Sequence, residues 1–377
     1  MSCRYSRREL LGAVAAAIAP RFVSATPLPA ARVAIAKTKT YGPELVPVLA
    51  RMFDQIGGIG TLVRGKTVAI KLNLTGSPKY RLGHSPAELA QWTYPDVIGA
   101  AVHLIGKAGA KRIRLLESPW NTAEPVETYM LEANWEPRNL LGAAQNVEFE
   151  NTNYLGNGKK YSRLFVPKGG HMFRAFDLNH SYEDCDVFVS IAKLKEHATA
   201  GVTLSMKNCF GITPCTIYGD GSAVDEPSLV PQGGRGPIHA GNRQPSKSAL
   251  PENDPSSPRN GGYRVPRVVA DLVAARPIQL AIIDGIESMA GGEGPWVRGT
   301  RRNSPGVLIA GTNPVSTDAV AMAVMGFDPM ADRGTAPFET CDSALRLAEE
   351  LGAGTRDLKR IEVAGASIRD STHRFRI

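Results

Sequence analysis

Cationic and titratable residues gather in one short stretch of the sequence, directly after an apolar run. The stretch contains Lys193, Lys195, His197, Lys207 and Asn208. The preceding run, residues 187–191, is β-branched, aromatic and short, which is typical of a buried parallel strand. Ligands of open α/β sheets bind at the carboxyl ends of the strands. Ammonium groups, an imidazole and an amide at such an end therefore predict an anion site, and a merely solvated loop is the alternative.

Other expected strands also end on polar or charged residues. These ends supply Lys71 with Asn73, Glu117, Asp284, and Thr312 with Asn313. In a parallel sheet such ends share one edge, so we expect these groups to converge on one cleft. We predict acid–base roles for His197, Asp284 and Glu117. We predict ligand-binding roles for Lys71, Asn73, Lys193, Lys195, Lys207 and Asn208. Asp318, at the start of an expected helix, is interpreted as structural.

Motifs of common cofactor and hydrolase sites are missing from the sequence. The glycine-rich stretch 291–295, GGEGP, is followed by no Lys-Ser/Thr and lacks the G-x-G-x-x-G spacing, so it predicts a tight turn. There is no H-x-x-x-H pair and no G-x-S-x-G elbow. We predict no metal, and the sequence identifies no cofactor.

The cysteines show no C-x-x-C spacing, which argues against zinc and redox motifs. Four of them follow the N-terminal leader: Cys185, Cys209, Cys215 and Cys341. We expect buried free thiols, although Cys209 and Cys215 are close enough in sequence to pair or to ligate a metal.

Three motifs together resemble a known family. They are KLKEH at 193–197 continued by TLSMKNCFGITP at 203–214, VAIKLNL at 68–74, and IIDG at 282–285 followed by GGEGP. The pattern resembles the core signature of domain-of-unknown-function family 362, over about residues 32–351. The resemblance implies a shared fold and no particular reaction. Some members carry appended ferredoxin-like cysteine motifs, which this sequence lacks, so no iron–sulfur cluster is implied.

Alternating apolar strands and amphipathic helices predict an α/β fold. We expect one domain, residues 32–377, with a mostly parallel sheet of repeated βαβ units flanked by helices. Strands are expected at 32–37, 67–71, 112–116, 147–151, 187–191, 278–283, 307–310 and 361–364, with a hairpin at 161–178. Helices are expected at 44–56, 95–108, 126–135, 265–275, 316–325 and 343–351. Residues 216–262, rich in Gly, Pro, Ser and Asn, predict an irregular flap over the cleft or an insertion.

The N-terminus has the pattern of a twin-arginine signal peptide. Ser-Arg-Arg-Glu-Leu-Leu at 6–11 is followed by a modestly hydrophobic segment and by Val-Ser-Ala at 23–25. We expect residues 1–25 to direct export to the periplasm by the twin-arginine machinery. The segment is too short for a stable membrane anchor. A cytosolic start with a chance Arg-Arg pair is the alternative.

Composition narrows the class of function. The 377 residues are 43% hydrophobic, 21% charged and 7% aromatic, with a net charge of +8. A mild positive balance without clustered basic runs favours an anionic small molecule over nucleic acid. We expect an exported enzyme of redox or acid–base type, and a non-catalytic periplasmic ligand- or cofactor-binding protein is the alternative. An analogy to the nickel-pincer lactate racemases, which also use lysine and histidine on an α/β frame, assigns no function.

Overall fold

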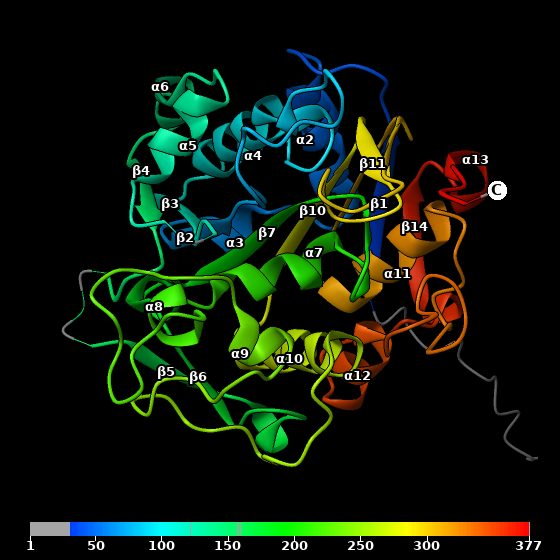
Figure 1. Ribbon diagram of the computed structural model, residues 1–377. Helices are drawn as coiled ribbons and strands as arrows, with labels where there is room; N and C mark the ends of the chain where they lie inside the picture. Colours follow the sequence, from blue (N-terminus) through cyan, green and yellow to red (C-terminus); the bar gives the residue numbers. More distant parts are fainter. Residues whose placement is uncertain (1–30, 121, 157, 159, 377) are drawn as a thin grey trace, which may run out of the picture.

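The computed structural model describes residues 31–120, 122–156, 158 and 160–376. Within these residues, eight strands form one sheet in the order β14-β1-β13-β10-β7-β2-β3-β4, and helices pack on both of its faces (Figure 1). The fold is therefore α/β, as predicted. The expected leader, residues 1–25, lies outside the described residues. In the described chain no helix has the length and apolar character needed to cross a membrane.

The sheet is mostly parallel. Its strands are β1 (Ala31–Lys37), β2 (Thr67–Lys71), β3 (Arg112–Glu117), β4 (Val147–Asn151), β7 (Val187–Lys193), β10 (Leu280–Gly285), β13 (Val307–Gly311) and β14 (Ile361–Gly365). Smaller antiparallel pairs are β5 (Ser162–Phe165) with β6 (Ala175–Leu178), β8 (Glu196–His197) with β9 (Gly201–Val202), and β11 (Ser288–Ala290) with β12 (Arg301–Asn303). The expected hairpin at 161–178 is thus confirmed.

Strand β13 runs antiparallel to both of its neighbours, β1 and β10. Its carboxyl end therefore lies at the opposite edge of the sheet from the ends of β2, β3, β7 and β10. The expectation that Thr312 and Asn313 join the common cleft is wrong for this reason. The Asn313 side chain instead caps the following helix by accepting a hydrogen bond from the backbone N–H of Ser316 at 3.0 Å.

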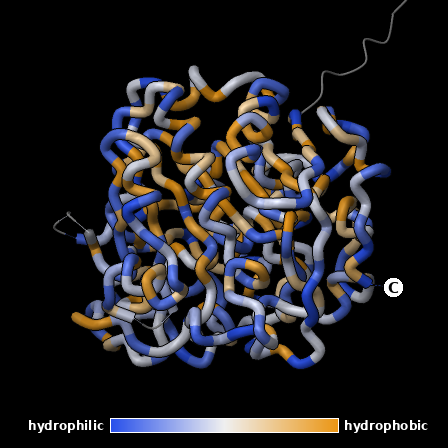
Figure 2. Tube along the Cα trace, turned by 90° about the horizontal axis from the view of Figure 1, so that it is seen from above, coloured by the Kyte–Doolittle hydropathy of each residue, from blue (hydrophilic) through white to orange (hydrophobic). Residues whose placement is uncertain are grey.

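The sheet divides the hydrophobic core into two layers. Along β7, Val187, Val189 and Ile191 pack on one side and Phe188 on the other, as the two-residue period of a strand requires. The first layer lies under α2 (Leu45–Gln55), α3 (Gly60–Val63), α4 (Pro95–Lys107), α5 (Val126–Glu132) and α6 (Pro137–Leu141). The second lies under α7 (Leu204–Asn208), α8 (Cys215–Tyr218), α9 (Gly236–His239), α10 (Gly261–Ala275), α11 (Pro314–Val324) and α12 (Ala344–Glu350). Figure 2 shows hydrophobic segments inside and hydrophilic ones at the periphery.

The segment 216–262 is irregular apart from the end of α8, the short α9 and the start of α10. Helix α10 begins at Gly261, four residues before its expected start, because the side chain of Asn260 accepts a hydrogen bond from the Tyr263 N–H at 2.9 Å. The buried Glu252 carboxylate pairs with Arg259 at 2.5 Å and with Arg264 at 2.7 Å. The segment is thus anchored by internal ion pairs. Its motion over the cleft stays a prediction.

Candidate functional site

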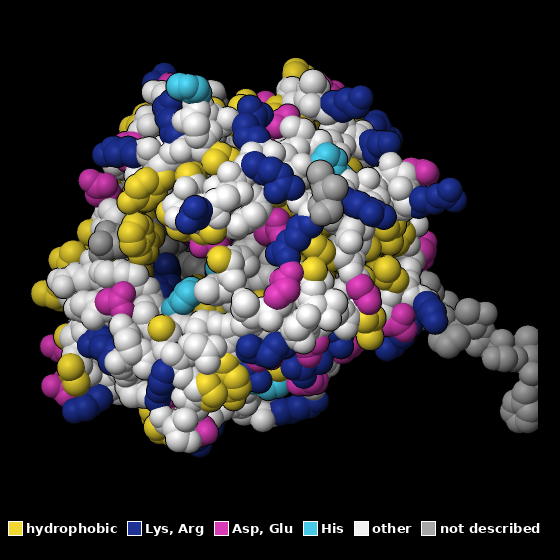
Figure 3. Space-filling model, turned by 45° about the vertical axis from the view of Figure 1, so that its right-hand side comes forward, with side chains coloured by type: hydrophobic (Ala, Val, Ile, Leu, Met, Phe, Trp, Pro, Cys, Tyr) yellow, Lys and Arg dark blue, Asp and Glu magenta, His cyan; other side chains and the backbone are white. Residues whose placement is uncertain are grey.

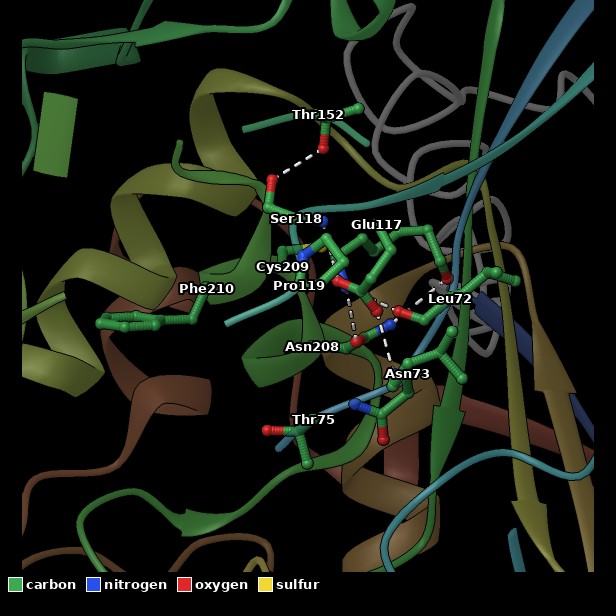
Figure 4. A network of polar contacts seen from close by, with 12 residues as sticks. Leu72, Asn73, Thr75, Glu117, Ser118, Pro119, Thr152, Asn208, Cys209 and Phe210 are labelled. Carbon is green, nitrogen blue, oxygen red and sulfur yellow. Dashed lines mark hydrogen bonds and ion pairs between the residues drawn. The ribbon is translucent and has the colours of Figure 1, made fainter. Parts of the chain in front are cut away.

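A polar cavity of about 90 Å³, the inner cavity, lies at the carboxyl ends of β2, β3 and β7. Seven of the nine predicted site residues line it: Lys71, Asn73, Glu117, Lys195, His197, Lys207 and Asn208. Figure 4 shows that Glu117 and Asn208 point toward one another beside Asn73, although they come from three separate segments. The prediction that strand ends converge holds for the residues that follow β2, β3 and β7, because these strands run parallel, whereas Lys207 and Asn208 come from helix α7.

Lys71 and Glu117 form a buried ion pair on one wall of the inner cavity. They end the neighbouring parallel strands β2 and β3, and their side-chain N and O atoms are 2.5 Å apart. Lys71 also donates to the carbonyl of Leu72 at 2.6 Å. Glu117 accepts from the backbone N–H groups of Leu74 and Ser118 at 2.9 and 3.1 Å. Burial lowers the pKa of Lys71, and the Glu117 carboxylate opposes this shift. Because both groups have internal partners, the pair stabilises the wall of the cavity.

Helix α7 carries Lys207 into the inner cavity. The Asp318 carboxylate of α11 holds the first turn of α7 by accepting from the N–H groups of Ser205 and Met206, both at 2.9 Å. The residue predicted to be structural therefore supports a neighbouring helix rather than its own. The Lys207 ammonium lies 4.4 Å from the centroid of the Phe210 ring. Among the described residues it has neither a hydrogen-bond acceptor nor an ion-pair partner.

The surroundings of Lys207 make proton exchange near neutral pH accessible to it. Burial lowers the pKa of Lys207 to about 8; Glu293 opposes the shift, and the cationic groups of Arg235 and Lys71 add to it. A lysine poised near neutral pH can act as a general acid or base. The same ammonium, when protonated, attracts an anion.

Lys195 and His197 follow β7, with His197 as the last residue of β8. Lys195 donates to the backbone carbonyls of Gln91 at 2.7 Å and Glu293 at 2.9 Å, and burial lowers its pKa well below the usual value. The Nδ1 atom of His197 accepts from the Thr199 N–H at 3.2 Å, which assigns the ring proton to Nε2. Burial and the Lys207 charge lower the pKa of His197 well below its usual range, so the ring is neutral near pH 7.

Two charged residues of the inner cavity were not predicted as members of an anion site. Glu293 comes from the GGEGP turn. Its carboxylate accepts from the Ala198 N–H at 3.0 Å. Burial opposes ionisation, yet the His197 ring and this backbone donor bring its pKa to about 2. Arg235, from the irregular segment, donates to the carbonyls of Thr213 and Ser118 at 2.8 and 2.9 Å. No motif surrounds Arg235 in the sequence, so its position in the cavity could not be predicted from sequence.

Charge in the inner cavity is unbalanced. Among the described residues, four cationic side chains and two carboxylates line it. The cationic groups are Lys71, Lys195, Lys207 and Arg235. Because Glu117 is already paired with Lys71, the remaining cations exceed the remaining carboxylate, Glu293. An anion entering this cavity would meet unpaired positive charge, with which it can form charge-assisted hydrogen bonds.

Lys193 and Asp284 form a separate buried pair and do not line the inner cavity. Their charged atoms are 2.8 Å apart, and both side chains are 0% exposed. Lys193 also donates to the Glu88 carbonyl at 2.8 Å and to the Tyr41 hydroxyl at 3.3 Å. Asp284 accepts in addition from the Tyr94 N–H at 3.0 Å. The structure thus separates these two predicted residues from the other seven.

A second, wider cavity of about 590 Å³, the outer cavity, adjoins the inner one and shares Lys207, His197, Arg235 and Glu293 with it. Trp120, Trp296, Tyr80 and His239 also line the outer cavity. Figure 3 shows a face of the molecule where hydrophobic side chains lie beside a hollow with basic and histidine side chains. The volume is in the range of pockets that hold small organic molecules.

Metal ligands do not cluster in the described part of the chain, where no group of three or more His, Cys, Asp and Glu side chains is placed to hold an ion. The cysteines described there, Cys185, Cys209, Cys215 and Cys341, are free thiols. Burial raises the pKa of Cys209 to about 12, so it stays protonated. Pairing of Cys209 with Cys215, one of the alternatives from sequence, is not present.

A family model named "Domain of unknown function (DUF362)" matches residues 68–323, more than half of the chain. The chain belongs to DUF362. All seven predicted residues of the inner cavity lie inside the matched region, as do Arg235, Glu293 and Asp318. The site is therefore built within the DUF362 domain.

A protein of Synechocystis sp. named "Thylakoid-associated protein sll1697" is 27% identical to this DUF362 protein over 194 residues. The alignment covers 48% of this chain and 50% of that protein. The chain thus spans about half the length of the curated relative it matches.

Proposed function

We propose that this DUF362 protein is an enzyme that binds a small organic anion in the inner cavity and acts on it by acid–base chemistry. The observation that carries the proposal is Lys207, a cation without an internal partner among the described residues, in a cavity with excess positive charge. Its pKa of about 8 suits proton transfer near neutral pH. The anionic group of the ligand is a carboxylate or a phosphate.

The other side chains divide into holding and positioning groups. Lys195 and Arg235 hold the anion, since their described contacts are backbone carbonyls rather than carboxylates. The Nε2–H of His197 is a neutral donor. The Asn73 side chain accepts from the Lys193 N–H through its oxygen at 3.2 Å, and its Nδ2 donates to none of the described residues. These groups provide the donors that a carboxylate or phosphate needs.

A non-catalytic ligand-binding protein is the second candidate. It is favoured by the engagement of two predicted acid–base carboxylates, Glu117 and Asp284, in internal lysine pairs. An enzyme needs a group that exchanges a proton with the ligand, whereas a carrier needs only donors. The two functions therefore differ in proton uptake.

Calorimetric titration of the purified protein with acetate and with methyl phosphate tests the anion site. Lys207→Met is expected to weaken binding by about 1.5–3 kcal/mol, the contribution of a charge-assisted hydrogen bond. Lys79→Met is the matched control, because the Lys79 side chain is 74% exposed and lies outside both cavities. Equal affinities of the Lys207→Met variant and the parent protein would overturn the site.

The acid–base role is tested by repeating the titration at pH 8 in buffers with different ionisation enthalpies. An anion raises the pKa of a neighbouring ammonium, so the parent protein is expected to take up protons on binding. Lys207→Arg keeps the charge but stays protonated, and its proton uptake should fall. Binding with the same uptake in parent and variant would remove Lys207 as the exchanging group.

We also propose export by the twin-arginine machinery, which the Arg7-Arg8 pattern supports. Replacing both arginines by lysine should leave uncleaved precursor in the cytoplasm, as seen by fractionation and immunoblotting. Normal export of this double variant would remove the proposal.

A further inference from the structure

We infer that the ligand is an aromatic acid, with its anionic group in the inner cavity and its ring in the outer cavity. This inference rests on the proposed anion site and adds the class of molecule that the anion belongs to. The evidence is a set of aromatic side chains in the outer cavity, beside the inner one. These side chains are partly exposed, yet contacts with the rest of the protein fix their positions.

Half of the tryptophans in the chain are found at this mouth. Trp92 and Trp135 are buried in the core, at 0% and 8% exposure. Trp120 and Trp296 are each 45% exposed, and both line the outer cavity. Tyr80, 44% exposed, lines it as well. Large aromatic groups that remain half exposed around one cavity are typical of a ligand site, since they offer flat apolar faces to a bound molecule.

Trp296 is held in a cradle of glycines. A Cβ atom at Gly76 would lie 2.4 Å from its indole, and one at Gly294 would lie 2.2 Å from it. The indole N–H donates to the Glu293 carboxylate at 3.1 Å, and the ring meets Tyr80 edge-on with centroids 5.8 Å apart. Gly294 belongs to the GGEGP turn. This turn places Glu293 at the inner cavity and leaves space for the Trp296 ring in the outer cavity.

Trp120 is fixed independently, on the segment that follows β3. Its carbonyl accepts from the Tyr129 hydroxyl at 3.3 Å. Its indole nitrogen lies 3.2 Å from the position a Cβ would take at Gly234, the residue before Arg235. Trp120 also lines the inner cavity. Two tryptophans from different parts of the chain thus lie beside the cationic groups Arg235 and Lys207, which places flat rings next to the anion site.

The ligand class follows from this arrangement. An acid with an aliphatic tail would gain from apolar contact alone, whereas an aromatic ring also gains from stacking on indole and phenol rings. The outer cavity, at about 590 Å³, has room for one or two fused rings. The binding order predicted for model acids is therefore 2-naphthoate, benzoate, cyclohexanecarboxylate and acetate, from tightest to weakest.

The test measures the dissociation constants of these four acids with the purified protein, by calorimetry or ligand-observed NMR. We expect benzoate to bind about tenfold more tightly than acetate. Trp296→Leu and, separately, Trp120→Leu should remove most of this gain, so that the ratio of the acetate to the benzoate dissociation constant falls towards one. Phe165→Leu is the matched control, because Phe165 is 67% exposed and lies outside both cavities. It should change nothing.

The outcomes separate this inference from the proposed function. If acetate binds through Lys207 and benzoate gains nothing, the aromatic class is wrong and the anion site stands. If cyclohexanecarboxylate binds as tightly as benzoate, stacking is absent and the inference also fails. If the aromatic acids bind equally well to the parent protein and to Lys207→Met, the ring binds without its anion being held, which overturns both. The two tryptophan variants lie on separate segments, so misfolding of one leaves the other as a test.

Discussion

Lys193 and Lys207 both reach the carboxyl edge of the sheet, but their surroundings are opposite. The Lys193 ammonium has three acceptors, from Asp284, Glu88 and Tyr41, and is sealed from water. The Lys207 ammonium has none within the described residues and lines a cavity. The first lysine saturates its hydrogen bonds inside the protein, and the second keeps them for a ligand. Of these two lysines, only Lys207, which has no internal acceptor among the described residues, keeps all of its N–H groups available to a ligand.

Removing Lys193 should have the largest effect on stability. Lys193→Met leaves the Asp284 carboxylate buried without its cation, which is expected to lower the free energy of unfolding by about 3–5 kcal/mol. Urea unfolding at pH 7 measures this loss. Combining Lys193→Met with Asp284→Asn removes both charges, so the double variant should lose less than the two single variants together. A loss below about 1 kcal/mol in Lys193→Met would mean that the pair is not structural.

Removing Lys207 should change the free energy of unfolding in the opposite direction. Lys207→Met is expected to raise the free energy of unfolding by about 1–2 kcal/mol at pH 7, because it deletes a partly buried charge next to other cations. The full effect of the pKa shift is larger, but the cavity admits water to the ammonium and reduces it. A variant that unfolds more easily than the parent would show that Lys207 has a structural role.

The pH dependence of the free energy of unfolding gives a second test of the role of Lys207. The pKa of Lys207 lies at about 8 in the folded protein against 10.5 for an ordinary lysine. Between these values the unfolded chain binds more protons than the folded one, so the stability of the parent rises with pH across this window. Lys207→Met should show a smaller rise, measured by urea unfolding at pH 7.5, 9 and 10.

Much of the fold followed from apolar periodicity. The strands expected at 67–71 and 147–151 coincide with β2 and β4, and the other sheet strands differ from expectation by at most two residues at either end. The direction of β13 could not be predicted, because periodicity reports burial and not orientation. The β11–β12 pair was missed because its strands have three residues each, too few to show a period of two.

The candidate site was predictable where side chains follow strands and where Lys207 and Asn208 continue the motif after β7. Lys71, Glu117 and Lys195 could be placed at the edge because a parallel sheet fixes where its strands end. The sequence could not predict that Lys193 is paired internally and Lys207 is not, because the acceptors of Lys193 come from segments distant in sequence. Arg235 reaches the cavity from an irregular segment, where no period constrains its position. The roles of the cavity residues as ligand contacts remain predictions.

The smallest expected effect concerns a single hydroxyl group, that of Thr203. Thr203, just before α7, is buried and lines the inner cavity, and its Oγ1 has no hydrogen-bond partner in the described part of the chain. Thr213 is also buried, but its Oγ1 donates to the Phe210 carbonyl at 2.8 Å. Thr203→Val removes no internal hydrogen bond, so unfolding should change by less than about 0.5 kcal/mol, whereas Thr213→Val should cost about 1 kcal/mol.

Anion binding should respond in the reverse order. If the Thr203 hydroxyl donates to the ligand, Thr203→Val weakens acetate binding by about 0.5–1.5 kcal/mol, and Thr213→Val leaves it unchanged. Calorimetric titration and urea unfolding of both variants give one acetate affinity and one free energy of unfolding for each. Equal destabilisation by the two substitutions, with acetate affinity unaffected, would show that Thr203 serves the fold. The hydroxyl would then belong with Lys193 among the groups that the protein uses internally.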